Sequence, residues 1–136
     1  MKLSVVIPAR NEEATLPRTV ESIRQTLQRG GIEHELLVVD DHSTNRTAQV
    51  VRALAEQWGT VRLVTNDFAP GVGCAIQRGL EAMTGEAVAI MMADGSDDPT
   101  DLVAYHRTLR DGYDCVFGSR FIRGARLVGY PWHKLL

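Results

Sequence analysis

The sequence predicts an α/β fold in which helices cover both faces of a mostly parallel sheet, and three observations lead to this prediction. Short apolar runs alternate along the chain with longer stretches of helical periodicity. Glycine and proline residues separate most of these segments. The 136 residues are enough for one compact core, so we expect a single domain over residues 1–136.

Five runs of apolar and β-branched residues have the length and composition of buried strands. Pro8 closes the first run, and the Asp111-Gly112 pair turns the chain into the last. The five predicted strands are residues 3–7, 36–40, 61–65, 87–92 and 113–117.

Helices are expected between these strands. In the first helix, Leu16, Val20, Ile23 and Leu27 recur at helical spacing. Ser43 or Thr44 is expected to cap the second helix, and Asp98 is expected to cap the fourth, with Pro99 at its first helical position. The helices are predicted to run over residues 14–29, to about residue 58, over 73–83, and to about residue 110.

Composition and charge exclude several classes of function. A formal net charge of −2 is unsuited to nucleic-acid binding, which requires a basic surface. The longest apolar run, residues 87–93, falls far short of the roughly 20 residues that a membrane span requires. No signal-peptide pattern precedes the first strand. We therefore expect a cytoplasmic protein, which could still lie at the inner face of a membrane.

Acidic residues follow three of the predicted strands. Parallel sheets bind ligands at the carboxyl ends of their strands, where these residues would gather. The strand ends carry residues 8–12, the Asp40-Asp41 pair and residues 93–98. No nearby basic run explains these carboxylates as ion pairs. The sequence therefore predicts a ligand site at this edge of the sheet.

The individual acids differ in how far the sequence assigns them. A functional role is favoured for Asp40, because a buried strand end rarely keeps an acid without a partner. For Asp41, two alternatives stay open: a hydrogen bond to a base or ribose, and a local Asx turn. Asp94 suits a hard divalent cation, which prefers oxygen ligands. The role of Asp97 is undecided.

Two further features follow the later strands. The Gly71-Val72-Gly73 loop lacks the third glycine of a dinucleotide fingerprint, and it follows the third predicted strand, not the first. Arg120 stands just past the fifth predicted strand, where its planar fork of donors suits phosphate oxygens. A role in anion binding is therefore expected for Arg120.

Taken together, five segments of the chain resemble family 2 glycosyltransferases, and they come in the family's order. The first resembles the opening V-I-P-x-x-N-E and the second the V-V-D-D-x-S motif, and the fourth stands where the family has its metal-binding D-x-D. The last resembles the G-S-R-[FY] of dolichyl- and polyprenyl-phosphate sugar synthases. The segments are residues 4–12, 37–43, 71–80, 93–99 and 116–121.

The resemblance implies a GT-A fold, a Rossmann-like nucleotide-binding domain. It implies a donor that is a GDP- or UDP-linked sugar, a Mg²⁺ or Mn²⁺ cofactor and a lipid-phosphate acceptor. Asp94 and Arg120 would be the catalytic residues, and Asp94 with Asp97 the metal ligands. The residues expected to bind the nucleotide sugar are Pro8, Ala9, Arg10, Glu12, Asp40, Asp41, Gly73, Arg78 and Ala93.

Two departures from the family pattern affect the expected function. Met92 replaces the leading aspartate of the D-x-D motif, so one metal carboxylate is missing. The chain ends at Leu136, where relatives continue into acceptor-side helices, so we expect an N-terminal fragment. A saccharide acceptor and a non-catalytic sugar-nucleotide-binding module remain the alternatives. An apolar surface left by such truncation could also support a homodimer.

Overall fold

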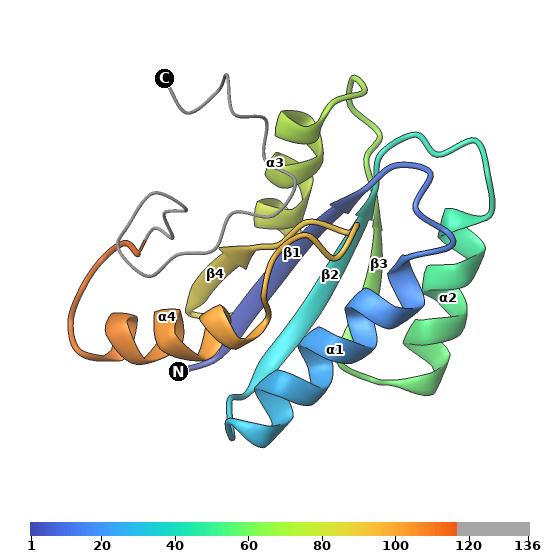
Figure 1. Ribbon diagram of the computed structural model, residues 1–136. Coiled ribbons are helices and arrows are strands. Elements are labelled where there is room, and N and C mark those ends of the chain that lie inside the picture. The colour runs from blue at the N-terminus through green and yellow to red at the C-terminus, as the bar shows by residue number, and fades with distance from the viewer. Residues whose placement is uncertain (117–136) are drawn as a thin grey trace, which may run out of the picture.

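The computed structural model describes residues 1–116, which form a four-stranded parallel sheet with helices on both faces (Figure 1). The strands lie in the order β3-β2-β1-β4. This arrangement confirms the predicted α/β class. The strands are β1 (Leu3–Ala9), β2 (His34–Asp40), β3 (Val61–Thr65) and β4 (Ala87–Ile90). The helices are α1 (Leu16–Arg29), α2 (Thr47–Gln57), α3 (Val72–Ala82) and α4 (Thr100–Arg110).

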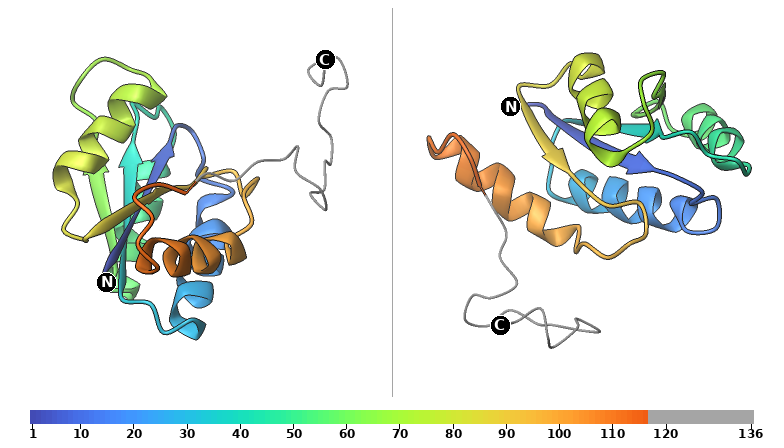
Figure 2. Two further views of the ribbon diagram at one scale, coloured as in Figure 1. Left: turned by 90° about the vertical axis from the view of Figure 1, so that its left-hand side faces the viewer. Right: turned by 90° about the horizontal axis from the view of Figure 1, so that it is seen from above.

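Two hydrophobic cores lie on opposite faces of the sheet. The helices α1, α2 and α4 pack on one face and α3 packs on the other, so the sheet lies between them (Figure 2). Because side chains alternate along a strand, Val5 and Ile7 join the first core whereas Val6 joins the second. This two-sided burial explains why β1 and β2 have nearly continuous apolar sequences.

The helix α3 approaches the sheet closely at Gly79. A Cβ atom added to Gly79 would lie 2.5 Å from Val6 Cγ1 and 3.3 Å from Val39 Cγ2. The first distance is shorter than real Cβ atoms show, so a side chain at position 79 would force Val6 or α3 to shift. The glycine thus sets the distance between α3 and the sheet.

The predicted fifth strand is wrong in the part that the structure describes. Residues 113–116 form no strand, whereas Phe117 lies outside the described residues. Tyr113 is 65% exposed, and Asp114 interrupts the apolar pattern. The segment therefore lacks the apolar face that a buried strand requires.

The predicted cap of α2 is also wrong, because the helix begins at Thr47 after Arg46. Ser43 and Thr44 instead bond to Asn11 in the preceding loop. Asp98 bonds to the first turn of α4 as predicted. The helix begins at Thr100, one residue later than expected. The Asp98 carboxylate accepts the backbone N–H of Thr100 at 3.0 Å and the Thr100 hydroxyl at 2.8 Å, and these bonds lower the pKa of Asp98.

Candidate functional site

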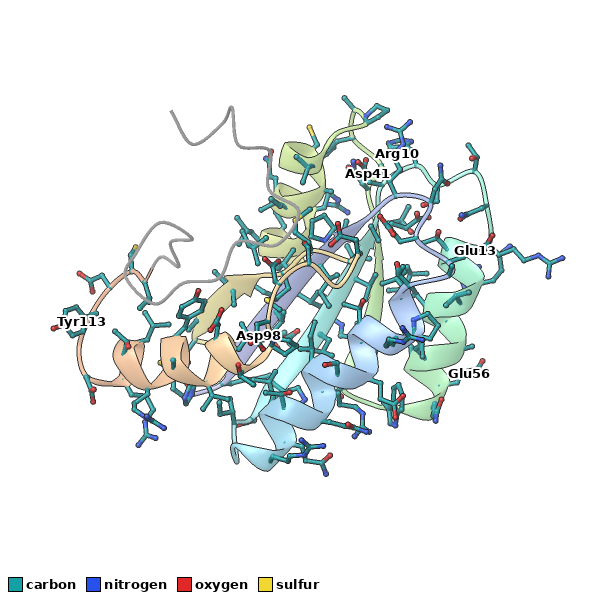
Figure 3. All side chains as sticks on the ribbon, viewed as in Figure 1. Arg10, Glu13, Asp41, Glu56, Asp98 and Tyr113 are labelled. Atoms are coloured by element: carbon teal, nitrogen blue, oxygen red, sulfur yellow. The ribbon has the colours of Figure 1, made fainter. Side chains whose placement is uncertain are left out.

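A cleft of about 300 Å³ opens at the carboxyl edge of the sheet. Because neighbouring strands are parallel, the loops after β1, β2 and β4 meet there, together with the loop before α3. Figure 3 shows Arg10 and Asp41 side by side at this edge. The cleft is lined by Pro8, Ala9, Arg10, Glu12, Asp41, Gly71, Val72, Met92, Ala93 and Asp94.

Most of the residues predicted to bind a ligand meet in this cleft, but four of them do not line it. Asp40 accepts the backbone N–H of Ser43 at 3.3 Å. Arg78 forms ion pairs with Asp67 and Glu81 at 3.0 and 2.7 Å. The predicted residues that lie outside the lining are Asp40, Gly73, Arg78 and Asp97. Arg120 lies outside the described residues.

The turn between β1 and α1 is locked to the loop after β2. Asn11 has φ 55°, a left-handed conformation that asparagine tolerates better than most residues. Its backbone N–H donates to Ser43 Oγ at 2.9 Å, and its Oδ1 accepts the N–H of Thr44 at 2.8 Å. Glu12 N–H donates to Thr47 Oγ1 at 3.1 Å. These bonds hold two walls of the cleft together.

Asp41 combines a place in the cleft with a structural role. Its side chain is nearly buried, and it accepts the Nδ2–H of Asn66 at 2.9 Å and the backbone N–H of Gly71 at 3.1 Å. The carboxylate that bonds to the local backbone is instead that of Asp40, whose Oδ1 accepts the N–H of Ser43 three residues on. Asp41 therefore fixes the loop before α3 while its carboxylate lines the cleft.

Asp94 lies on the exposed loop between β4 and α4. The hydroxyl of Ser96 and its backbone N–H, which is 2.9 Å from Asp94 Oδ1, lower the pKa of the Asp94 carboxyl. The loop turns at Gly95 with φ 77°, and Asp97 Oδ2 accepts the N–H of Met92 at 2.8 Å. The result is an ionised carboxylate on the wall of the cleft.

Within residues 1–116, no group of three or more His, Cys, Asp or Glu side chains could hold a metal ion. Magnesium in proteins commonly takes one or two carboxylates and completes its shell with substrate phosphates and water. Asp94 fits such a site, because a phosphate in the cleft could supply further oxygen ligands. The donor set therefore favours a cation that binds together with a ligand.

Sequence reasoning missed three residues of the cleft lining: Gly71, Val72 and Met92. Gly71 has φ 141°, which favours glycine, and the preceding Pro70 marks the turn in the sequence. The sequence pattern marks Met92 only as a position that lacks the expected carboxylate. No local sequence pattern predicts that Val72 lines the cleft.

The geometry agrees with a family assignment. The model of the family described as Glycosyl transferase family 2 matches residues 4–136. This chain belongs to glycosyl transferase family 2. Within the residues that the structure describes, no helix of this family 2 chain is long and apolar enough to cross a membrane.

Two curated relatives illustrate what this family 2 chain resembles. It is 29% identical over 136 residues to a dolichol-phosphate mannosyltransferase from Pyrococcus furiosus, which covers 100% of this chain and 38% of the relative. It is 32% identical over 142 residues to an undecaprenyl-phosphate 4-deoxy-4-formamido-L-arabinose transferase from Photorhabdus laumondii, covering 99% and 42%. The chain thus spans about two fifths of the length of these relatives.

A solved structure supports the fold assignment. Glucosyl-3-phosphoglycerate synthase from Mycobacterium tuberculosis, in complex with Mn²⁺ and UDP-glucose, aligns with a TM-score of 0.67 and 30% identity. The alignment covers 82% of this family 2 chain and 40% of the synthase. The GT-A fold implied by the sequence motifs is thereby confirmed.

Proposed function

We propose that this chain binds a nucleoside-diphosphate sugar in its cleft and acts in transfer of the sugar to a polyprenyl phosphate. The observation that carries this proposal is the meeting of the β1–α1 turn, Asp41 and Asp94 around one cleft. The similarity to a dolichol-phosphate mannosyltransferase and to an undecaprenyl-phosphate transferase supports this class of acceptor.

The donor would lie across the carboxyl edge of the sheet. Residues 8–12 and Asp41 would surround the base and ribose, because the backbone and carboxylate there offer both hydrogen-bond donors and acceptors. Arg10 would place positive charge near the diphosphate. Either a GDP- or a UDP-linked sugar suits this arrangement.

Asp94 would hold a divalent cation, Mg²⁺ or Mn²⁺, and Asp97 remains a predicted second ligand. When bound, the cation supplies charge stabilisation to the nucleoside diphosphate as it leaves. The low pKa of Asp94 favours its ionised, ligand-competent form. Arg120 is proposed to neutralise diphosphate or acceptor charge. A phosphate acceptor is already an anion and requires little help from a general base.

Calorimetric titration with nucleoside diphosphates and their sugars, with and without Mn²⁺, tests the donor site. Asp94→Asn is expected to weaken Mn²⁺-dependent binding by at least about tenfold, because the hydrogen-bond geometry stays while the charge is lost. Asp98→Asn is the matched control. It removes a carboxylate from the same loop, but Asp98 does not line the cleft and asparagine can also cap a helix.

Each outcome decides one part of the proposal. Wild-type protein that binds none of the nucleotides would overturn the donor site, and equal affinities for wild type and Asp94→Asn would overturn the metal role. Transfer of labelled sugar to polyprenyl phosphate, but not to a free oligosaccharide, would support the lipid acceptor. Transfer to the oligosaccharide alone would favour the saccharide alternative, and binding without any transfer would favour a non-catalytic module.

A further inference from the structure

Two threonine hydroxyls of α1 and its N-terminus converge on the backbone carbonyl of Ala93, which directly precedes Asp94. The Thr19 hydroxyl lies 3.0 Å from Ala93 O, and the Thr15 hydroxyl lies 3.2 Å from it. Thr15 and Thr19 are one helical turn apart and therefore lie on one face. Ala93 and Thr19 are both buried, 2% and 8% exposed.

Other helical threonines of the same chain use their hydroxyls differently. The Thr26 hydroxyl donates to the carbonyl of Ser22 at 2.8 Å, and the Thr108 hydroxyl to the carbonyl of Ala104 at 2.9 Å. Both bonds stay within one helix and span four residues, as is usual for threonine. Thr19 instead donates across 74 residues to the loop after β4.

A hydroxyl has a single proton, so Thr15 cannot serve all of its neighbours at once. Its oxygen lies 2.8 Å from the Glu12 carboxylate and 3.2 Å from Ala93 O. Hydrogen bonds to an ionised acceptor are the stronger, so the Thr15 proton goes to Glu12. Thr19 has no competing acceptor within the described residues and is the principal donor to Ala93.

The hydrogen bond from Thr19 to Ala93 O anchors the β4–α4 loop to α1, and we call this bond the anchor. The loop has little other support on its α1 side. A cavity of about 360 Å³ lies between α1 and the loop, lined by residues that include Thr19, Asp94 and Asp97. The bonds from Ser96 to Asp94 and from Met92 to Asp97 shape the loop internally, but they do not tie it to the sheet or helices.

We infer that Thr19 is a positioning residue of the donor site, which orients Asp94 by fixing the Ala93 carbonyl; this inference rests on the proposed function. Because the peptide unit is planar, fixing the carbonyl also fixes the plane that leads into Asp94. The direction in which the Asp94 side chain leaves the backbone is then set before any ligand binds. Such preorganisation improves binding, because less of the loop must be ordered by the ligand.

The test compares three variants of α1. Thr19→Val removes the hydroxyl at nearly constant shape, and Thr19→Ser retains it. Thr26→Val is the matched control, because it removes a hydroxyl from the same helix without touching the loop. Two quantities are measured: the solvent exchange of the Met92 and Ser96 amides by NMR without ligand, and the Mn²⁺-dependent affinity for UDP and GDP.

We expect Thr19→Val to exchange both loop amides faster and to bind the preferred nucleotide about tenfold more weakly. Thr19→Ser should restore both quantities, and Thr26→Val should leave them unchanged. Exchange rates equal in Thr19→Val and Thr26→Val would overturn the anchor even where nucleotide binding is intact. Faster exchange with unchanged affinity would overturn the positioning role. A wild type that binds neither nucleotide would overturn the proposed function, while the exchange data still decide the anchor.

Discussion

Gly71 donates its backbone N–H toward both carboxylate oxygens of Asp41, each at 3.1 Å. The same carboxylate accepts an N–H of the Asn66 side chain. One buried acid after β2 thus organises the loop that precedes α3. Its exposed fraction is only 5%, so desolvation makes these hydrogen bonds important to stability.

Asp41→Asn is therefore expected to lower the free energy of unfolding by about 1–3 kcal/mol. The new NH₂ group, in the place of Oδ2, would face the Gly71 N–H that the native carboxylate oxygen accepts at 3.1 Å. Urea denaturation followed by circular dichroism measures the change. Asp40→Asn is the control, because its amide oxygen can still accept the Ser43 N–H, and a loss below about 1 kcal/mol is expected. Similar losses for both variants would contradict the structural role of Asp41.

The layout of the cleft could be predicted because parallel strands bring their carboxyl ends to one edge. This rule predicts that the β1 turn, Asp41 and Asp94 lie together, as they do in the cleft. It does not distinguish Asp40 from Asp41. The burial argument that favours Asp40 ignores the local backbone path, along which adjacent residues at a strand end diverge. The structure makes this distinction, with Asp41 lining the cleft and Asp40 bonded to Ser43.

Contacts between distant loops escaped sequence reasoning altogether. Ser43 resembled a helix cap, but it bonds to Asn11, 32 residues away. The bond from Thr19 to Ala93 joins residues 74 apart, and threonine in a helix carries no local signal for such a partner. Local patterns predicted the four helices and the first four strands well, whereas these cross-loop bonds depend on the three-dimensional arrangement of several segments.

Variants of Asn11 separate backbone strain from side-chain hydrogen bonding. Asn11→Gly keeps the freedom to adopt φ 55° but loses the acceptor for Thr44 N–H, so a loss of about 1 kcal/mol is expected. Asn11→Ala should lose about 1 kcal/mol more, because alanine adopts the left-handed conformation at a cost. Asn11→Asp keeps both features and should remain near wild type. Chemical denaturation measures the free energy of unfolding of the three variants. Equal stability of the Gly and Ala variants would show that the left-handed backbone at position 11 costs alanine nothing.

Glu35 lies near the start of β2, at the end away from the cleft, and is expected to contribute to stability in a pH-dependent way. Burial alone would raise its pKa, but hydrogen bonds from Thr84 and Arg62 and the charge of Lys2 outweigh this and leave the pKa below its ordinary 4.5. The Arg62 contact is 2.9 Å and the Lys2 contact 3.7 Å. Because the folded pKa is depressed, the stabilisation is present above the unfolded pKa and is lost as pH falls through the folded pKa.

The stability difference between wild type and Glu35→Gln should therefore be constant near neutral pH and narrow below about pH 4.5. At neutral pH we expect a difference of about 1–3 kcal/mol, because hydrogen bonds to a charged acceptor are lost. Urea unfolding over this pH range measures it. Glu86→Gln, which removes an exposed carboxylate beside β4, should not reproduce the narrowing. A stability difference that widens on acidification would contradict the lowered pKa of Glu35.

Gly79 and Gly73 both lie on α3, but replacement by alanine is expected to change the free energy of unfolding in opposite directions. At Gly79 the new methyl group would meet Val6 at 2.5 Å, so overpacking should lower the free energy of unfolding by about 1–3 kcal/mol. At Gly73 it would meet nothing within 4 Å, and the higher helix propensity of alanine should raise stability by up to about 1 kcal/mol. Equal effects in urea denaturation would contradict the close approach of α3 to the sheet.

The stable Gly73→Ala variant also tests the predicted nucleotide contact, because weaker nucleotide binding at undiminished stability would place Gly73 at the ligand.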